Sequence, residues 1–252
     1  MDKKEVIQNY DREGASYDSM RYGRTRGGRY FSEVELSNTL KMLKPGSVLH
    51  VGTATGRVST YLASKGFDYV GLEISETMAR ISAAKLNGRG SIVRGDAEHL
   101  PFKPGSFDNV VSVRSFHFLP HPESFMRDAN LILRQTGRLT VSFEKYVPGR
   151  EAFRKLMKLP PSIVRRTYYT NSHVSSMMRS AGFQPLLVRN ATKFPLLVYW
   201  RTKNDVILRK MHGKIPSLLG TVGVVVGGKQ NSLTGRLEKS TPVGVRSYLP
   251  GD

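Results

Sequence analysis

Residues 48–57 read VLHVGTATGR, a short apolar run followed by a turn with two glycines. The run 47–51 is short, apolar and β-branched, which predicts a strand, and residues 57–64 predict a helix that ends before Gly66. Gly52 and Gly56 allow positive φ and carry no Cβ, so a ligand can lie against the backbone where helix N–H groups point outward. The stretch therefore predicts a β-turn-α unit with a ligand site at its turn.

The alternation of strands and helices continues along the chain. Further strands are predicted at 69–73, 92–94, 107–113 and 139–143, and helices at 27–43, 75–86 and 122–133, with Ser75 as an N-cap. Such alternation indicates an α/β fold, with a mostly parallel sheet covered by helices on both faces. Beyond residue 145 several prolines break the pattern. There we expect helices at 151–158 and 171–180, strands at 186–188 and 222–226, and a polar tail from Lys229 to Asp252.

The composition limits the class of protein. The 252 residues carry 39 Lys and Arg and 20 Asp and Glu, a net charge of +19. By count, 146–252 hold 18 of the basic residues but only 4 of the acidic ones, which indicates an anionic partner or a solvated basic surface. The absence of Cys excludes disulfides, thiolate zinc sites and a Cys nucleophile. No apolar run approaches the ~20 residues of a spanning helix, and no secretory leader is evident, so we expect an intracellular protein.

Two acidic side chains follow the second and third predicted strands. Glu73 lies 73 − 52 = 21 residues after Gly52, close to the ~20-residue offset at which a carboxylate accepts hydrogen bonds from a ribose diol. Asp96 follows strand 92–94 and is placed to accept a hydrogen bond from an exocyclic amine such as that of adenine. Together with the glycine turn they predict a nucleoside across the tips of adjacent strands.

Four motifs in this order resemble the class I S-adenosylmethionine-dependent methyltransferases, in the branch similar to the ubiquinone and menaquinone biosynthesis enzymes (methyltransferase type 11 domain). They are VLHVGTATGRVSTYLA, YVGLEISETMA, RGDAEHLPF and FDNVVSVRSFHFLPHPESFMRDANLILRQTGRLTVS. The resemblance implies a three-layer, doubly wound Rossmann-like fold with a seven-stranded sheet, and S-adenosylmethionine as cofactor. It also implies an N-terminal helical lid at 1–45, a cofactor core at 46–145, substrate-side elements and last strands of the same domain at 146–229, and a polar tail at 230–252 for which no ordered structure is expected.

The resemblance assigns roles to individual residues. Cofactor binding is implied for Gly52, Thr53, Ala54, Gly56, Glu73, Ile74, Asp96, Ala97 and Ser115, and for Tyr17 and Arg29 from the lid. Arg114 is expected beside the sulfonium and the substrate. His117 is the candidate general base for an acidic acceptor, with a structural role, packing or capping the next helix, as the alternative. No metal site is expected.

The chain departs from the family pattern at three places. His50 stands where the family has an acid, which is expected to weaken cofactor binding, and Ala54 stands where a glycine is usual. Residues 134–137, RQTG, replace the family's lysine-proline-glycine-glycine, a change that we assign to turn geometry.

The expected function is methyl transfer by in-line displacement to a small-molecule or lipid-like acceptor of the quinone or isoprenoid type. Residues 194–201, FPLLVYWR, suit a membrane interface, or alternatively a buried strand or helix over the substrate pocket. If this segment lies at a membrane interface, we expect a cytoplasmic protein that binds peripherally to an anionic membrane through its basic C-terminal half. The alternatives are a tRNA or rRNA methyltransferase, with nucleic acid as partner, and a catalytically inactive cofactor-binding protein.

Overall fold

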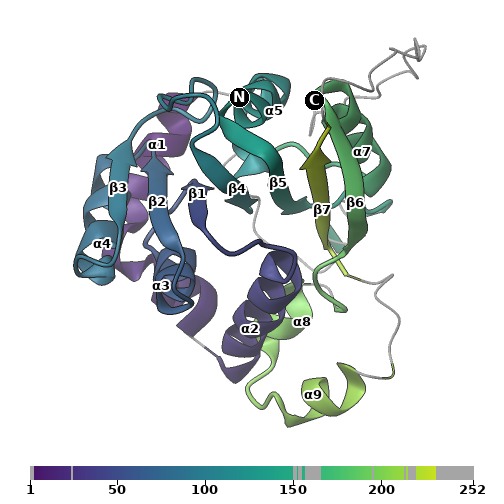
Figure 1. Cartoon of the computed structure of the whole chain (residues 1–252). Helices are drawn as coiled ribbons and strands as arrows, with labels where there is room; N and C mark the ends of the chain where they lie inside the picture. Colours follow the sequence, from purple (N-terminus) through teal and green to yellow (C-terminus); the bar gives the residue numbers. More distant parts are fainter. Residues whose placement is uncertain are drawn as a thin grey trace.

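The computed structural model describes residues 3–23, 25–149, 152, 155–156, 166–194, 196–212, 214 and 220–230. These residues form a seven-stranded sheet in the order β3-β2-β1-β4-β5-β7-β6, flanked by helices on both faces (Figure 1). The strands are β1 Ser47–Val51, β2 Asp68–Glu73, β3 Ser91–Arg94, β4 Phe107–Val113, β5 Leu133–Glu144, β6 Phe183–Asn190 and β7 Val222–Lys229. The predicted doubly wound α/β fold is confirmed.

The sheet is parallel from β3 to β5, and β7 is inserted antiparallel between β5 and β6. Val51 at the end of β1 pairs with Leu72 of β2 and Ser112 of β4, so the carboxyl ends of these strands lie at one level. The chain reverses its strand order beside β1, which opens a crevice beyond those ends. The glycine turn, Glu73 and residue 114 are brought together there.

The helices are α1 Lys3–Glu13, α2 Arg26–Leu40, α3 Arg57–Ser64, α4 Glu76–Leu86, α5 Pro122–Ile132, α7 Asn171–Ser180, α8 Leu196–Arg201 and α9 Val206–His212. Short helical turns at Gly14–Ser16, Ser19–Gly23 and Phe116–Phe118 connect some of them. The predicted N-cap is confirmed, since the Ser75 hydroxyl accepts a hydrogen bond from Met78 N. The predicted helix at 151–158 lies almost wholly outside the described residues.

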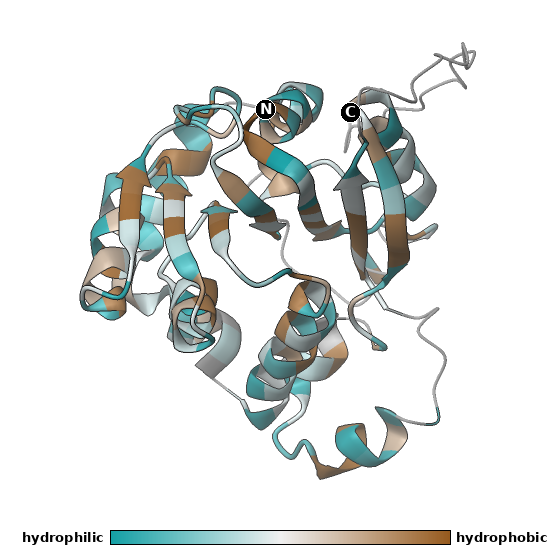
Figure 2. Cartoon of the chain, viewed as in Figure 1, coloured by the Kyte–Doolittle hydropathy of each residue, from teal (hydrophilic) through white to brown (hydrophobic). Residues whose placement is uncertain are grey.

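The core is divided between the two faces of the sheet. On one face Leu49 and Val51 of β1 pack with α5 and α7, and on the other Val48 packs with α3 and the end of α2. A third cluster joins α2, α8, α9 and β7 through Phe31, Tyr199 and Val224. Figure 2 shows the hydrophobic positions concentrated on the strands and on the inward sides of the helices. Burial of these side chains, worth roughly 25 cal/mol per Å² of apolar area, fixes the frame of the site.

Two sequence-based expectations are wrong in detail. Residues 134–137 do not form a turn, because β5 begins directly at Leu133 after α5. Leu133 pairs with Phe107, a bulge follows, and Arg134 forms an ion pair with Asp108, so pairing with β4 holds this polar segment extended. Lys229, predicted as the start of the tail, is the last residue of β7, and 231–252 lie outside the described residues.

None of the helices in the described ranges is both long enough and apolar enough to cross a membrane.

Candidate functional site

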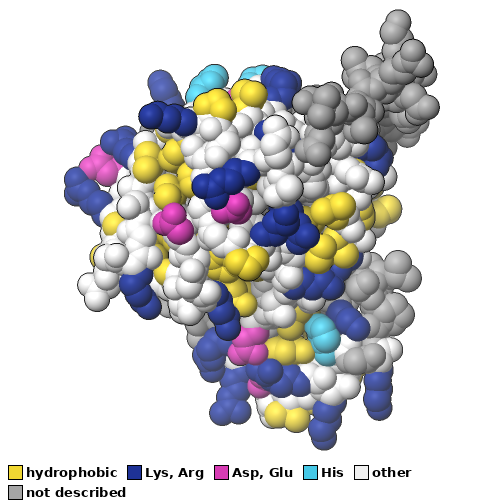
Figure 3. All heavy atoms as spheres, viewed as in Figure 1, with side chains coloured by type: hydrophobic (Ala, Val, Ile, Leu, Met, Phe, Trp, Pro, Cys, Tyr) yellow, Lys and Arg dark blue, Asp and Glu magenta, His cyan; other side chains and the backbone are white. Residues whose placement is uncertain are grey.

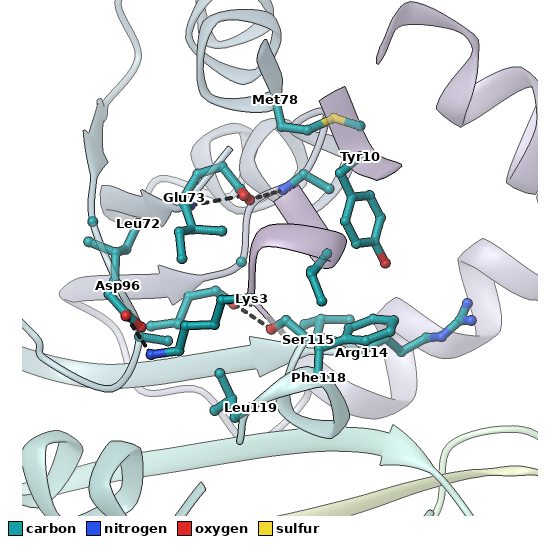
Figure 4. A pocket seen from close by; sticks show the side chains of 18 of the residues that line it. Lys3, Tyr10, Leu72, Glu73, Met78, Asp96, Arg114, Ser115, Phe118 and Leu119 are labelled. Carbon is teal, nitrogen blue, oxygen red and sulfur yellow. Dashed lines mark hydrogen bonds and ion pairs between the residues drawn. The ribbon is translucent and has the colours of Figure 1, made fainter. Parts of the chain in front are cut away.

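A cavity opens at the carboxyl ends of β1, β2 and β4 and is covered by the N-terminal segment (Figure 4). The strand ends and the loops after them contribute Gly52, Ala54, Glu73, Ile74, Asp96 and Ala97. Arg114 and Ser115 line it after β4, and Lys3, Val6, Tyr10 and Tyr17 line it from the N-terminal segment. The N-terminal segment, which the resemblance assigns to a lid, thus lines the same cavity as the glycine turn and Glu73.

The glycine turn is fastened to β2 by a buried carboxylate. One oxygen of Glu73 accepts a hydrogen bond from Ala54 N at 2.7 Å, and the other accepts from Ile74 N and Ser75 N at 3.0 Å each. Ala54 has φ +45°, an unusual conformation for a residue with a Cβ, and this bond holds it there. Burial raises the pKa of Glu73, and the three N–H donors oppose that shift.

Close packing explains the glycine at position 52. Gly52 has φ +78°, and a Cβ added there would collide with the side chain of Ser115. The Ser115 hydroxyl donates to the carbonyl of Val51 at 2.7 Å and lies 2.7 Å from the Ser112 hydroxyl. The strand ends β1 and β4 are thus tied together at the floor of the cavity.

The opposite end of the cavity carries an ion pair between the lid and the loop after β3. Lys3 Nζ lies 2.6 Å from Asp96 Oδ2 and also pairs with Glu98, while Asp96 Oδ1 accepts a hydrogen bond from Glu98 N at 3.0 Å. Hydrogen bonds and the charge of Lys3 lower the pKa of Asp96 despite the opposing effect of burial. Asp96 is therefore ionised at neutral pH and offers a carboxylate oxygen at the edge of the cavity.

Two further acids attach the lid to the core. Asp11 accepts a hydrogen bond from the Ser75 hydroxyl. Asp18 accepts one from the Thr55 hydroxyl and pairs with Lys85 of α4. These contacts close the lid over the glycine turn.

Arg114 stands in a strained conformation after β4. Its φ is +56°, and its N–H donates to both the carbonyl and the hydroxyl of Ser142 at 3.1 and 3.0 Å. The guanidinium points away from the Lys3 and Asp96 end of the cavity (Figure 4) and lies 3.1 Å from Glu144 and 3.7 Å from Glu35. Neighbouring negative charge raises its pKa against the opposing burial, so Arg114 is a permanent cation.

Arg114 belongs to a buried chain of alternating charges. Glu35 of α2, fully buried, also pairs with Arg57 Nη2 at 2.7 Å, and Glu144 at the end of β5 also pairs with Arg166 at 2.6 Å. The Arg57 guanidinium lies 4.2 Å from the ring centroid of Tyr22. One chain of alternating charges therefore runs from α2 and α3 to the end of β5. It consists of the guanidinium groups of Arg57, Arg114 and Arg166 and the carboxylates of Glu35 and Glu144.

Three residues assigned by the resemblance do not line either of the two cavities described. Gly56 is the N-cap of α3 and packs on Ser82, which is a structural role. Arg29 lies on an exposed face of α2. His117 is 1% exposed, and its ring centroid lies 4.3 Å from that of Phe118 at a tilt of 45°, a packed position that favours the structural alternative.

Several site residues were not predicted. Lys3, Val6, Met78 and Phe118 line the cavity, and Glu35, Arg57 and Glu144 form the buried charge chain. The sequence offered one signal for Glu35, since it is an acidic residue within the apolar pattern that predicts a helix at 27–43. It offered none for Lys3, which lies in a charged segment without an apolar motif.

Comparison with known proteins identifies the core. Residues 49–141 match the family model described as a methyltransferase domain. A demethylmenaquinone methyltransferase of Thermotoga maritima is 27% identical over 153 residues, covering 60% of this chain and 66% of that protein. The 18S rRNA (guanine-N(7))-methyltransferase of Bos taurus is 36% identical over 77 residues, covering 30% of this chain and 27% of that protein. The chain thus spans less than two thirds of either relative.

The fold has solved counterparts. The crystal structure of an S-adenosylmethionine-dependent methyltransferase from Thermotoga maritima has a TM-score of 0.67 and 23% identity, covering 88% of this chain and 99% of that one. Residues 49–141 are thus a methyltransferase domain, and the fold around them is that of the S-adenosylmethionine-dependent methyltransferase structure.

Proposed function

We propose that the protein binds S-adenosylmethionine in the cavity and transfers its methyl group to a small-molecule or lipid-like acceptor. The observation that carries the proposal is the Glu73 carboxylate, which fastens the glycine turn and also lines the cavity. A carboxylate at the place of Glu73 suits a ribose diol, and the ionised Asp96 at the far end suits an exocyclic amine.

The residues present fit this cofactor. Glu73 would hold the ribose, Ile74 and Ala97 would contact the adenine, and Asp96 would accept from its amine. Gly52 and Ala54 line the cavity without a large side chain, so the methionyl end can approach the backbone of the turn closely. When bound there, the cofactor would supply a methyl group activated by its sulfonium, for in-line transfer to the acceptor with S-adenosylhomocysteine as the other product.

The chain's own residues position the reactants and exclude water. The lid residues Val6, Tyr10 and Tyr17 cover the crevice, and Phe118 and Leu119 line its side after β4. Holding two reactants in line removes much of the entropic barrier. Arg114 is a fixed cation at the cavity edge, placed to favour an acceptor that has lost its proton to solvent before the site closes over it.

An apolar acceptor is supported by the cavity and by one relative. Leu72, Met78, Phe118 and Leu119 contribute apolar walls. The relative named demethylmenaquinone methyltransferase makes a quinone-type acceptor the leading candidate for this chain. The Bos taurus relative is named for an RNA substrate, so RNA is the competing acceptor in the test below.

We further propose that α8 and α9 dock on an anionic membrane. Val198, Val206, Ile207 and Met211 are exposed by 38%, 46%, 63% and 41%, and Arg201, Lys203, Lys210 and Lys214 are exposed around them. Figure 3 shows basic side chains and a hydrophobic group at the lower end of the molecule, where Figure 1 places α9. Apolar groups surrounded by cations suit the interface of an anionic bilayer. Residues 194–201 contribute less than the sequence suggested, because Phe194 and Tyr199 are buried.

The acceptor is tested with methyl-labelled S-adenosylmethionine and two substrates, a reduced short-chain isoprenyl naphthoquinone and total RNA. Label in the organic extract supports the proposal. Label only in RNA, or no transfer to either acceptor despite cofactor binding, contradicts it.

Membrane docking is tested by sedimentation with vesicles that contain or lack phosphatidylserine. The double variant Ile207→Glu/Met211→Glu is expected to lose binding to the anionic vesicles, whereas Leu131→Glu, at an exposed site on α5, is the matched control. Equal sedimentation of all three proteins would exclude α9 as the docking element.

A further inference from the structure

A second, smaller cavity lies beneath the glycine turn. Tyr17, Gly52, Ala54 and Val113 line both cavities, so the two meet at this turn. The small cavity extends from there to His50 and Arg57. A group that enters the large cavity beside Gly52 can therefore reach these two side chains.

His50 presents an unsatisfied nitrogen to this space. The ring is 1% exposed, and Nδ1 lies 3.2 Å from the Tyr69 hydroxyl. That hydroxyl is 2.6 Å from the Ser59 hydroxyl, which is 3.2 Å from the Ser82 hydroxyl. Nε2 has no hydrogen-bond partner among the residues that the structure describes. Since a buried polar nitrogen without a partner is costly, a ligand atom at Nε2 would recover that cost.

The hydroxyl chain is compatible with a donor at Nε2. If each hydroxyl donates toward His50, from Ser82 through Ser59 and Tyr69, Nδ1 accepts and Nε2 carries the proton. Burial, reinforced by the Arg57 charge, lowers the pKa of His50 to about 3, so the ring is neutral and this tautomer can exist at physiological pH.

The charges around the small cavity favour an anion. Arg57 contributes a guanidinium, and none of the described lining residues is Asp or Glu. Two carboxylates stand just outside this lining: Glu35 pairs with Arg57, and Asp18 accepts a hydrogen bond from Thr55. Arg57 is the charged side chain among the described lining residues, so an anion in the cavity would meet its guanidinium directly.

We infer that the small cavity receives the α-carboxylate at the methionyl end of the cofactor, with His50 Nε2–H and the Arg57 guanidinium as its partners. The inference rests on the proposed function, because it assumes that the nucleoside end occupies the large cavity. It gives His50, which replaces the family's acid, a role in selecting the cofactor.

The test is calorimetry on the full chain with S-adenosylhomocysteine and with its amine analogue, which lacks only the carboxylate. The wild type is expected to bind S-adenosylhomocysteine at least about tenfold more tightly than the amine, as for hydrogen bonds to charged groups. His50→Leu should remove most of this difference by weakening S-adenosylhomocysteine alone. His50→Gln, whose amide nitrogen can occupy the position of Nε2, should retain it, and His50→Asp should weaken S-adenosylhomocysteine further.

Equal wild-type affinities for the two ligands would overturn the inference, and this comparison needs no variant to fold. Equal weakening of both ligands by His50→Leu, or tighter S-adenosylhomocysteine binding by His50→Asp, would also overturn it. If the wild type binds neither these ligands nor 5′-methylthioadenosine, the proposed function itself fails. If 5′-methylthioadenosine binds but S-adenosylhomocysteine and its amine analogue bind with equal affinity, the nucleoside site stands and only the carboxylate site is refuted.

Discussion

The two ends of the cavity are held by ion pairs of different kinds. At the Asp96 end, the side chains of Lys3 and Asp96 are 31% and 30% exposed, and their pair joins the lid to a loop. At the other end, Arg114 and Glu144 are 9% and 1% exposed, and Glu35 is fully buried. An exposed pair contributes about 0–1 kcal/mol, whereas removal of one partner from a buried pair costs about 3–5 kcal/mol. The Lys3 end is therefore the weaker of the two, although Lys3 also pairs with Glu98, whose side chain is 5% exposed, and the other end holds a fixed geometry.

The largest effect is expected at the buried end. Glu35→Gln leaves Arg57 and Arg114 without their shared carboxylate, so the free energy of unfolding should fall by about 3–5 kcal/mol. For a chain of this size that lowers Tm by roughly 10 °C in a thermal melt. Glu33→Gln, on the same helix and in an exposed pair with Arg209, is the matched control and should change Tm little. Equal shifts for the two variants would remove the distinction between the ends.

A smaller effect is expected from pH at the same end. Unfolded His50 takes up a proton below pH 6.5, whereas in the native state, beside Arg57, Tyr69 and Thr53, its pKa is about 3. The folded pKa is the lower one, so stability is full above pH 6.5 and falls as the pH decreases. From pH 6.5 to 5 this group alone costs about 2 kcal/mol. Tm of His50→Gln should decrease less than wild type over that interval, and parallel decreases would show that His50 is not buried in this way.

The smallest effect is expected at the exposed end. Lys3→Met removes the link between α1 and Asp96, so S-adenosylhomocysteine should dissociate about two- to fivefold faster in stopped-flow measurements. Added salt should accelerate dissociation from wild type more than from this variant. Lys41→Met, an exposed lysine after α2, serves as control. A dissociation rate unaffected by Lys3→Met would mean that this pair does not retain the ligand.

The sequence predicted the parts of the site that local chemistry determines. Residues 47–51, the turn at Gly52 and the cap at Ser75 are specified by residue types a few positions apart, and all three are confirmed. The partner of Lys3 lies 93 residues away, and the partner of Arg57 lies in another helix, so no local pattern could reveal them. Arg29 lies on an exposed face of α2, and no described residue of that helix lines either cavity, because tertiary packing rather than residue type decides where the helix lies.

The start of β5 could not be predicted for a related reason. Residues 134–137 are polar and include Gly137, which is typical of a turn. Pairing of Leu133 with Phe107 and the ion pair of Arg134 with Asp108 outweigh that preference. Tertiary contacts also bury His117, which its position beside a strand end could not reveal, and its role as a base stays a prediction.

The central claim is that the cavity beside Glu73 binds the cofactor. Calorimetry of S-adenosylhomocysteine with wild type and Glu73→Gln tests it most directly, with Glu76→Gln on the adjacent surface as control. The account predicts one site in the wild type, at least tenfold weaker binding by Glu73→Gln as expected for a hydrogen bond to a charged group, and no change for Glu76→Gln. No binding by folded wild type, or equal binding by Glu73→Gln with an unchanged Tm, would contradict it.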